Sequence, residues 1–319
     1  MRCLALLLVV TACGDDDNMN THVDAAVDVA IDTPPAPPGH YHYVIDKVML
    51  PSTNNEARSY GLDLDMDSYV DNQMGMVIAT FAGMGVSSQT MMTKAIDSGS
   101  VIMLGDLYSL DLSNGIPATF TLFQGMHPTP PACAGPQDTT CRKHLNGNAA
   151  FDIDATAPVD PPLSGSTISM QYDGGPGHLT VQFVIGTSKA ARVTLLGAHA
   201  KLANISEASV QSAVIAGGIS TTDLDMKVIP AMREGFMATV MQDCTMLSSP
   251  PACGCAANST GKTYIGLFDT NSNCDISVDE VRNNSLIVSL LAPDVTLEGQ
   301  QALSFGFGAT FVKGAFIAP

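Results

Sequence analysis

The sequence predicts a β-rich α+β fold, in which antiparallel sheets form a sandwich or an open barrel with a few packed helices. Three observations indicate this class. Short apolar runs typical of strands recur along the chain, and helical periodicity is confined to four segments. Hydrophobic residues make up 45% of the chain and charged residues only 14%, while 28 glycines and 19 prolines provide turns between strands.

Alternating or continuously apolar runs predict about eight strands, separated by clusters of Gly, Pro and Asn such as 113–115 and 173–177. The predicted strands are 43–50, 101–112, 118–124, 149–154, 167–172, 178–185, 191–202 and 303–312. Strands of this length and spacing favour antiparallel sheets.

Apolar residues at helical spacing predict the four helices, which are 74–81, 90–96, 228–240 and 278–291. The third begins or kinks at Pro230, and the last stops before Pro293. The segment 259–268 contains two glycines and is predicted as loop or strand.

The beginning of the chain is typical of a bacterial lipoprotein signal. Arg2 supplies a positive charge, residues 3–10 form a short apolar run, and small residues precede Cys13. The sequence Val10-Thr11-Ala12-Cys13 resembles a lipobox, which implies a signal peptide over 1–12 and acyl chains on Cys13. A short N-terminal core strand is the less favoured alternative, because the polar run 14–18 follows it.

Acyl chains would hold the protein on a membrane without a transmembrane helix, and no later run approaches the eighteen apolar residues that a span needs. We therefore expect a lipid-anchored protein of the bacterial cell envelope, at the outer membrane or the cell surface. Residues 13–39, rich in Asp, Ala and Pro, predict a disordered tether, with a short amphipathic helix over 23–31 as the runner-up. Residues 40–319 would then form a single β-rich domain.

The net charge of −17 limits the classes of partner. Nucleic-acid binding is excluded, because it needs a basic face to replace the counterions on phosphate. Electrostatic adhesion to anionic lipid is equally disfavoured. A protein or ligand partner is not indicated by any motif.

Cysteine usage agrees with export. Besides Cys3 and Cys13, six cysteines remain, which are Cys133, Cys141, Cys244, Cys253, Cys255 and Cys274. This even number predicts three disulfides, and fifteen pairings are open. The first two bracket a Pro/Gly loop and make the most natural local pair. Zinc at Cys253 and Cys255 is disfavoured, because one intervening residue is fewer than the usual two to four.

The most specific motif is 269–280, whose oxygen-bearing residues follow the spacing of a twelve-residue calcium loop. Side-chain oxygens at positions 1, 3, 5, 9 and 12, and a backbone carbonyl at position 7, would come from Asp269, Asn271, Asn273, Ser277, Glu280 and Asp275, respectively. Position 6 departs from the pattern, because Cys274 stands where glycine normally makes the sharp turn. A left-handed backbone strains such a residue, so we expect a disulfide to hold it.

This segment resembles an EF-hand calcium loop. Because a helix is predicted only after the loop, the arrangement is closer to the dockerin type than to a paired EF-hand. The lipobox, the tether and the segment 268–295 together resemble the uncharacterised lipoproteins that are common in myxobacteria. The first resemblance implies bound calcium, and the second implies no known activity.

A second acidic segment carries a weaker calcium candidate. Asp63, Asp65 and Asp67 occupy positions 1, 3 and 5, the carbonyl of Tyr69 falls at position 7, and Asp71 falls at position 9. The bidentate carboxylate of position 12 is missing, because a methionine stands there. For both segments the alternative is a solvated acidic turn, since Asp and Asn favour turns for backbone reasons.

His40 and His42 could also bind a metal, but their place at the end of the tether favours a surface role. We expect a non-enzymatic protein that binds calcium for structure and has a structural or interaction role. An exported hydrolase with a scaffold calcium is one alternative, which would need a cleft with two carboxylates or a Ser–His pair. An apolar-ligand or lipid-binding protein is the other, which would need a large apolar cavity.

Overall fold

The structure is a computed structural model. The part of the chain that it describes comprises residues 37–83, 85, 87–135, 138, 140–184, 190–245 and 253–318. The predicted signal peptide over 1–12, the lipidation site Cys13, the runner-up helix over 23–31 and all but the last three residues of the tether lie outside it.

The strands confirm the predicted β-rich fold with antiparallel pairing. In chain order they are β1 (His40–Met49), β2 (Met103–Tyr108), β3 (Asn114–Thr129), β4 (Ala149–Ile153), β5 (Leu163–Ile168), β6 (Gln171–Val184), β7 (Ala190–Ile205), β8 (Ser209–Ser220), β9 (Val295–Leu297) and β10 (Gln300–Ala315).

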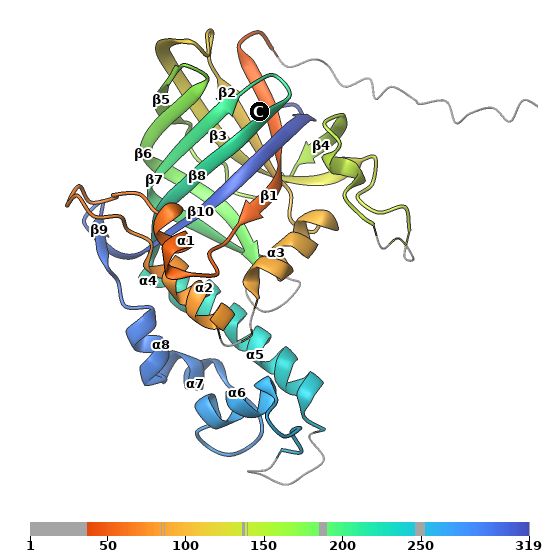
Figure 1. Cartoon of the computed structure of the whole chain (residues 1–319), viewed down its shortest axis with the longest axis vertical. Helices are drawn as coiled ribbons and strands as arrows, with labels where there is room; N and C mark the ends of the chain where they lie inside the picture. Colours follow the sequence, from red (N-terminus) through yellow and green to blue (C-terminus); the bar gives the residue numbers. More distant parts are fainter. Residues whose placement is uncertain are drawn as a thin grey trace, which may run out of the picture. The chain divides into compact units, whose positions relative to one another are not determined.

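The sheet closes on itself as a barrel (Figure 1). β1 pairs with both β2 and β10, and β3 pairs with both β2 and β5, so that eight strands pair in the ring β1-β2-β3-β5-β6-β7-β8-β10. The order in the ring is the order in the chain. β4 pairs outside the ring with the ends of β3 and β10, and β9 pairs with the start of β10.

Aromatic side chains from four strands of the ring, some of them not neighbours, meet inside it. The ring of Phe120 in β3 lies 6.2 Å from that of Phe311 in β10 and 6.1 Å from that of Tyr172 in β6. Tyr43 of β1 lies 6.4 Å from Phe311, and each of these four side chains is at most 1% exposed. Full burial of a phenylalanine contributes about 1.5–3 kcal/mol. These contacts make this part of the interior a packed core.

The helices follow three of the predicted segments and add others. They are α1 (Asn54–Ser59), α2 (Gln73–Gly83), α3 (Ser88–Asp97), α4 (Thr221–Asp223), α5 (Ile229–Asp243), α6 (Thr260–Phe268), α7 (Val278–Asn283) and α8 (Ser285–Leu290), with a π-helical turn at Leu224–Val228 before α5 and a 3₁₀ turn at Lys143–Leu145. None of the helices in the described ranges is both long and apolar enough to cross a bilayer.

Two segments differ from their predictions. The predicted helix 278–291 is two helices, because Asn284 is extended (ψ 127°) and its side chain accepts hydrogen bonds from the first N–H groups of α8. The segment 259–268 is helical rather than loop or strand. Ser259 caps α6 by accepting from Lys262 N, and Gly261 is required because an added Cβ would lie 2.8 Å from Asp243.

Two strand predictions were also wrong. The run 167–172 contains a hairpin turn, in which Ser169 and Met170 have φ of 52° and 60°. The cluster 173–177 lies inside β6 as a pair of bulges rather than between strands. β8 was not predicted from the sequence. Its Gly217 and Gly218 lie where a Cβ would meet neighbouring atoms at 2.9 and 2.7 Å.

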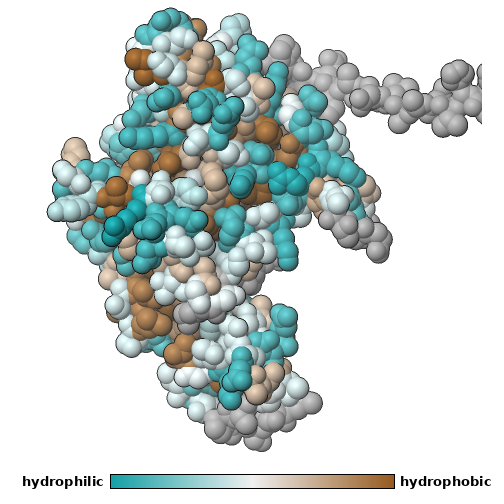
Figure 2. All heavy atoms as spheres, in the orientation of Figure 1, coloured by the Kyte–Doolittle hydropathy of each residue, from teal (hydrophilic) through white to brown (hydrophobic). Residues whose placement is uncertain are grey.

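Helices α2, α5 and α6 lie together beyond one end of the ring (Figure 1). Phe236 of α5 packs against Phe81 of α2, with ring centroids 5.9 Å apart, and stacks on Phe268 of α6 at 4.6 Å. This packing places the end of α6, where the acidic segment 269–280 begins, against α5. Figure 2 shows hydrophobic spheres gathered where α8 lies, on which Leu286 and Val288 are 38% and 57% exposed.

Candidate functional site

The segment 269–280 lies between two helices. Asp269 is the C-cap of α6, Ser277 is the N-cap of α7, and Glu280 lies in the first turn of α7. The predicted loop therefore has a helix on both sides, unlike the single following helix expected from the sequence.

In the first half of the loop, side-chain oxygens fold inward onto backbone N–H groups. Asp269 Oδ1 accepts from Asn273 N at 3.0 Å, Asp269 Oδ2 accepts from Cys274 N at 2.8 Å, and Asn273 Oδ1 accepts from Asp275 N at 2.8 Å. Cys274 has φ 64°, which is the left-handed backbone expected at position 6. Its disulfide with Cys253 ties this turn to the chain before α6, as the strain argument required.

Glu280 closes the second half of the loop. Its Oε1 accepts from Thr270 N at 2.9 Å, and its Oε2 accepts from Ser277 N at 2.8 Å and Ser277 Oγ at 2.9 Å. Burial raises the pKa of Glu280, but the hydrogen bonds from Ser277 and Thr270 outweigh it and bring the pKa to about 2. The carboxylate at position 12 is therefore ionised at neutral pH and reaches both ends of the loop.

Helix α5 holds the middle of the loop from outside. Arg233 pairs through Nη2 with the Asp275 carboxylate at 2.7 Å and donates through Nε to the carbonyl of Ile276. Ile276 is fully buried, and its N–H points to Met237 Sδ at 3.2 Å. Since Arg233 engages the Asp275 side chain, the backbone carbonyl is the group that Asp275 keeps for an ion. Arg233 was missed from the sequence, because it lies 42 residues away.

Hydrogen bonds link the six predicted ligand residues in two sets, in which Asn271 N also donates to Glu280 Oε1 at 3.3 Å. One set is Asp269, Asn273 and Asp275, and the other is Asn271, Ser277 and Glu280. Asp275 joins the first set through its N–H alone. A carboxylate oxygen has two acceptor sites, so each Asp269 oxygen, which accepts one hydrogen bond, keeps capacity for a cation. Glu280 Oε1 accepts three hydrogen bonds and Oε2 accepts two, so a cation bound to Glu280 would have to replace some of them. Cys253 and Cys274 also lie near Asp269, but their sulfurs are joined in a disulfide and offer no thiolate.

The weaker candidate has the same hydrogen bonds at the same positions. Asp63 accepts from Asp67 N at 3.1 Å and from Ser68 N at 3.0 Å, and Asp67 accepts from Tyr69 N at 2.8 Å. Met66 and Ser68, at positions 4 and 6, have φ of 64° and 74°. In the first loop these positions are Ser272 and Cys274, with φ of 59° and 64°. The two loops therefore share one backbone turn.

The loops differ in how they close. Asp71 Oδ2 accepts from Leu64 N at 2.8 Å, and ligand oxygens of Asp63, Asp65 and Asp71 lie within 4.8 Å of one another. Burial raises the pKa of Asp71, and the hydrogen bond from Leu64 N partly lowers it again. The negative charges of Asp65, Asp294 and Asp67 raise it further. Crowded carboxylates of this kind repel one another unless a cation lies between them.

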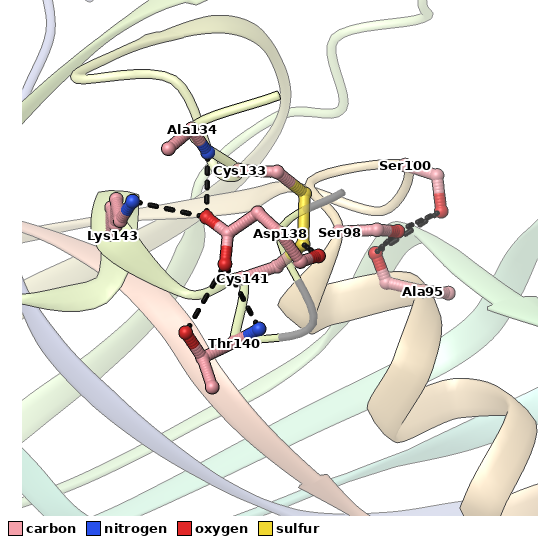
Figure 3. Close-up of a disulfide and its surroundings, with 9 residues drawn as sticks. All are labelled: Ala95, Ser98, Ser100, Cys133, Ala134, Asp138, Thr140, Cys141 and Lys143. Carbon is pink, nitrogen blue, oxygen red and sulfur yellow. Dashed lines mark hydrogen bonds and ion pairs between the residues drawn. A yellow bond between two sulfur atoms is a disulfide. The ribbon is translucent and has the colours of Figure 1, made fainter. Parts of the chain in front are cut away.

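The cysteines form the three disulfides expected, which are Cys133–Cys141, Cys244–Cys255 and Cys253–Cys274. The predicted local pair is confirmed. Figure 3 shows that Asp138 organises the loop around it, since its carboxylate accepts from Ala134 N at 2.6 Å, Thr140 N at 3.0 Å and Lys143 Nζ at 3.0 Å.

Comparison of this chain with protein-family models, with curated proteins and with solved structures finds no match.

Proposed function

We propose that this protein is a lipid-anchored protein of the bacterial cell envelope that binds calcium for structure and has a non-enzymatic, structural or interaction role. The observation that carries the calcium proposal is the closure of 269–280 by Asp269 and Glu280 between two helices. The shared turn at 63–71 supports a second, weaker site. Calcium would occupy the space between oxygen ligands at about 2.3–2.6 Å.

The proposed role of the ion is to hold α6 and α7 against α5. Only Asp269 and Glu280 bring ionised side-chain ligands to the first loop, so we expect weak affinity, in the range of about 10⁻⁴–10⁻³ M that extracellular modules show. At a Kd of ~10⁻⁴ M, ~2 mM calcium adds about 1.8 kcal/mol to the free energy of unfolding. Such a gain suits an ion that is constantly present outside the cell.

Disulfides persist in oxidising compartments and support export. The proposed membrane contact is the acylated Cys13, which dual or triple acylation would make stable. Intact-mass analysis of the native protein tests this part. Acyl chains on an N-terminal Cys13 are expected, and an unmodified Cys13 or a retained Met1 would overturn the localisation.

The decisive test of calcium binding compares Glu280→Ala with Asp279→Ala. Both remove an acidic side chain from the first turn of α7. Among the described residues, the Asp279 carboxylate pairs only with Arg282, on the exposed side. Thermal melts with calcium and with chelator should show a calcium-dependent rise in Tm for the wild type and Asp279→Ala, and little rise for Glu280→Ala. An equal rise in all three proteins would contradict the proposal.

The two alternatives have weaker support. An open groove beside β4 contains His127, Asp152 and Asp154, but hydrogen bonds from Thr156 lower the pKa of Asp154, which suits neither a general acid nor a base near neutral pH. An apolar cavity among α2, α3, α5 and α6 has a volume of about 60 Å³. A cavity that admits benzene is about 150 Å³, so this one does not fit a lipid chain as it stands.

A further inference from the structure

A second kind of metal-ligand cluster lies on the sheet, away from both acidic loops. His40 and His42 are two residues apart in β1, and Asp106 lies directly opposite His42 in β2. Because side chains alternate along a strand, the three side chains share one face of the sheet, and Tyr43 points the other way into the interior. The sequence alone favours a surface role for the histidines and gives no sign that Asp106 lies beside them.

The three side chains converge on a common point. His40 Nδ1 lies 3.0 Å from both carboxylate oxygens of Asp106, and His42 Nε2 lies 3.7 Å from Oδ1. One ligand atom from each residue lies within 4.8 Å of the other two. Ligand atoms about 2.0–2.1 Å from a tetrahedral ion are roughly 3.3 Å apart, so these separations need only small adjustments.

The state of His42 points to a missing ligand. Its side chain is only 7% exposed, and Nε2 is buried with no hydrogen-bond partner among the described residues. The distance to Asp106 is too long for a hydrogen bond. Phe316 stacks on the imidazole at 4.2 Å with an interplanar angle of 19°, which holds the ring in place. Leaving a buried polar nitrogen unpaired costs free energy, and a metal ion at the common point would remove that cost.

Other histidine–carboxylate pairs in the described ranges show what a plain ion pair looks like. His127 and Asp152 approach to 3.1 Å, but their side chains are 73% and 69% exposed. His178 and Glu298 approach to 2.9 Å, and their side chains are about 40% exposed. Neither pair has a second imidazole. The cluster on β1 and β2 differs in combining two imidazoles with a carboxylate whose side chain is 9% exposed.

We propose that His40, His42 and Asp106 form a binding site for a divalent transition metal of the zinc class. Two imidazole nitrogens and one carboxylate oxygen suit Zn²⁺, whereas Ca²⁺ and Mg²⁺ prefer oxygen ligands alone. The His40 side chain is 30% exposed, so the ion can enter from solvent and a water can complete its coordination. The bound ion would join β1 to β2 at the end of β1 where the predicted tether, residues 13–39, ends.

The test uses the purified protein with calcium at saturation, so that the acidic loops do not compete for the added metal. Zn²⁺ is titrated by calorimetry, and Co²⁺ is added as a spectroscopic probe of coordination. We expect one Zn²⁺ per chain and visible Co²⁺ absorption typical of a tetrahedral site. His40→Gln and Asp106→Asn should weaken Zn²⁺ binding by at least about a hundredfold, the upper end of the loss caused by removing an outer-shell partner.

His127→Gln is the matched control, because it removes an imidazole from a histidine–aspartate pair without a second imidazole, and it should bind Zn²⁺ as the wild type does. His40→Gln changes a partly exposed side chain, so circular dichroism should confirm that this variant is folded. Unchanged Zn²⁺ affinity in folded His40→Gln would overturn the proposal. So would no Zn²⁺ binding to the wild type at ~1 mM, a concentration at the weak end of the affinities of extracellular calcium modules. Neither result would bear on the calcium loops.

Discussion

Arg233 in α5 donates hydrogen bonds to the side-chain carboxylate of Asp275 and to the backbone carbonyl of Ile276, both in the loop 269–280. This contact joins a helix that packs on α2 to the turn that is proposed to hold calcium. The loop is therefore supported from outside, while Asp269 and Glu280 close it from within.

Arg233→Met should weaken calcium binding several-fold while leaving every proposed ligand in place. The methionine keeps much of the apolar stem but leaves the Ile276 carbonyl without its donor, and such a loss costs about 1–3 kcal/mol. Calcium titration by isothermal titration calorimetry provides the measurement. Arg282→Met is the control, because Arg282 pairs with exposed Asp279 and Asp225. Equal effects of the two variants would argue against support of the loop by α5.

The turn at position 6 can be tested apart from its disulfide. Removal of the Cys253–Cys274 bond, which spans 21 residues, should cost about 3 kcal/mol of unfolding free energy in the chain-entropy model. Cys253→Ser/Cys274→Gly should lose less stability than Cys253→Ser/Cys274→Ser, because glycine adopts φ 64° without strain. Chemical denaturation of both double variants decides this. A less stable glycine variant would contradict the strain argument.

Asp71→Asn should make the calcium-free protein more stable at neutral pH. The folded-state pKa of Asp71 is raised, so the folded state holds its proton to higher pH than the unfolded state does. Stability therefore falls as pH rises through this titration, and the neutral amide removes that loss. The same variant should respond less to calcium. Urea unfolding with chelator at several pH values measures the first effect, and a destabilised variant with an intact calcium response would refute the second site.

His144 should contribute to acid unfolding. It is 1% exposed and packs against Phe151, and burial followed by the charge of Arg142 lowers its pKa to about 4. The unfolded imidazole takes up a proton near pH 6.5 and the folded one does not, so stability should decline as pH falls from about 6.5 to about 4. His144→Phe should flatten this part of the stability profile. A profile as steep as that of the wild type would show that other groups cause the decline.

Local sequence signals were sufficient wherever a structure depends on neighbouring residues. The spacing of oxygens in 269–280 and 63–71 predicted turns that the structure shows, because an Asp at position 1 bonds N–H groups only four and five residues ahead. Helix α2 and the Cys133–Cys141 disulfide were predictable for the same reason. Helix α6 was not, since its two glycines lowered the helical signal and the packing that requires Gly261 involves α5.

Contacts between distant residues were decided by the tertiary structure alone. The sequence by itself determined the strand-rich class, the acidic turns and the even set of cysteines, because periodicity, turn chemistry and composition are local properties. It left open whether the strands would form a sandwich or a barrel, since the β1–β10 pairing joins segments more than 250 residues apart. The separate pairing of β1 with β2 places Asp106 opposite His42. Strand register and helix packing are set by the burial of whole faces, and this is why Arg233 and Asp106 became visible only in the folded chain.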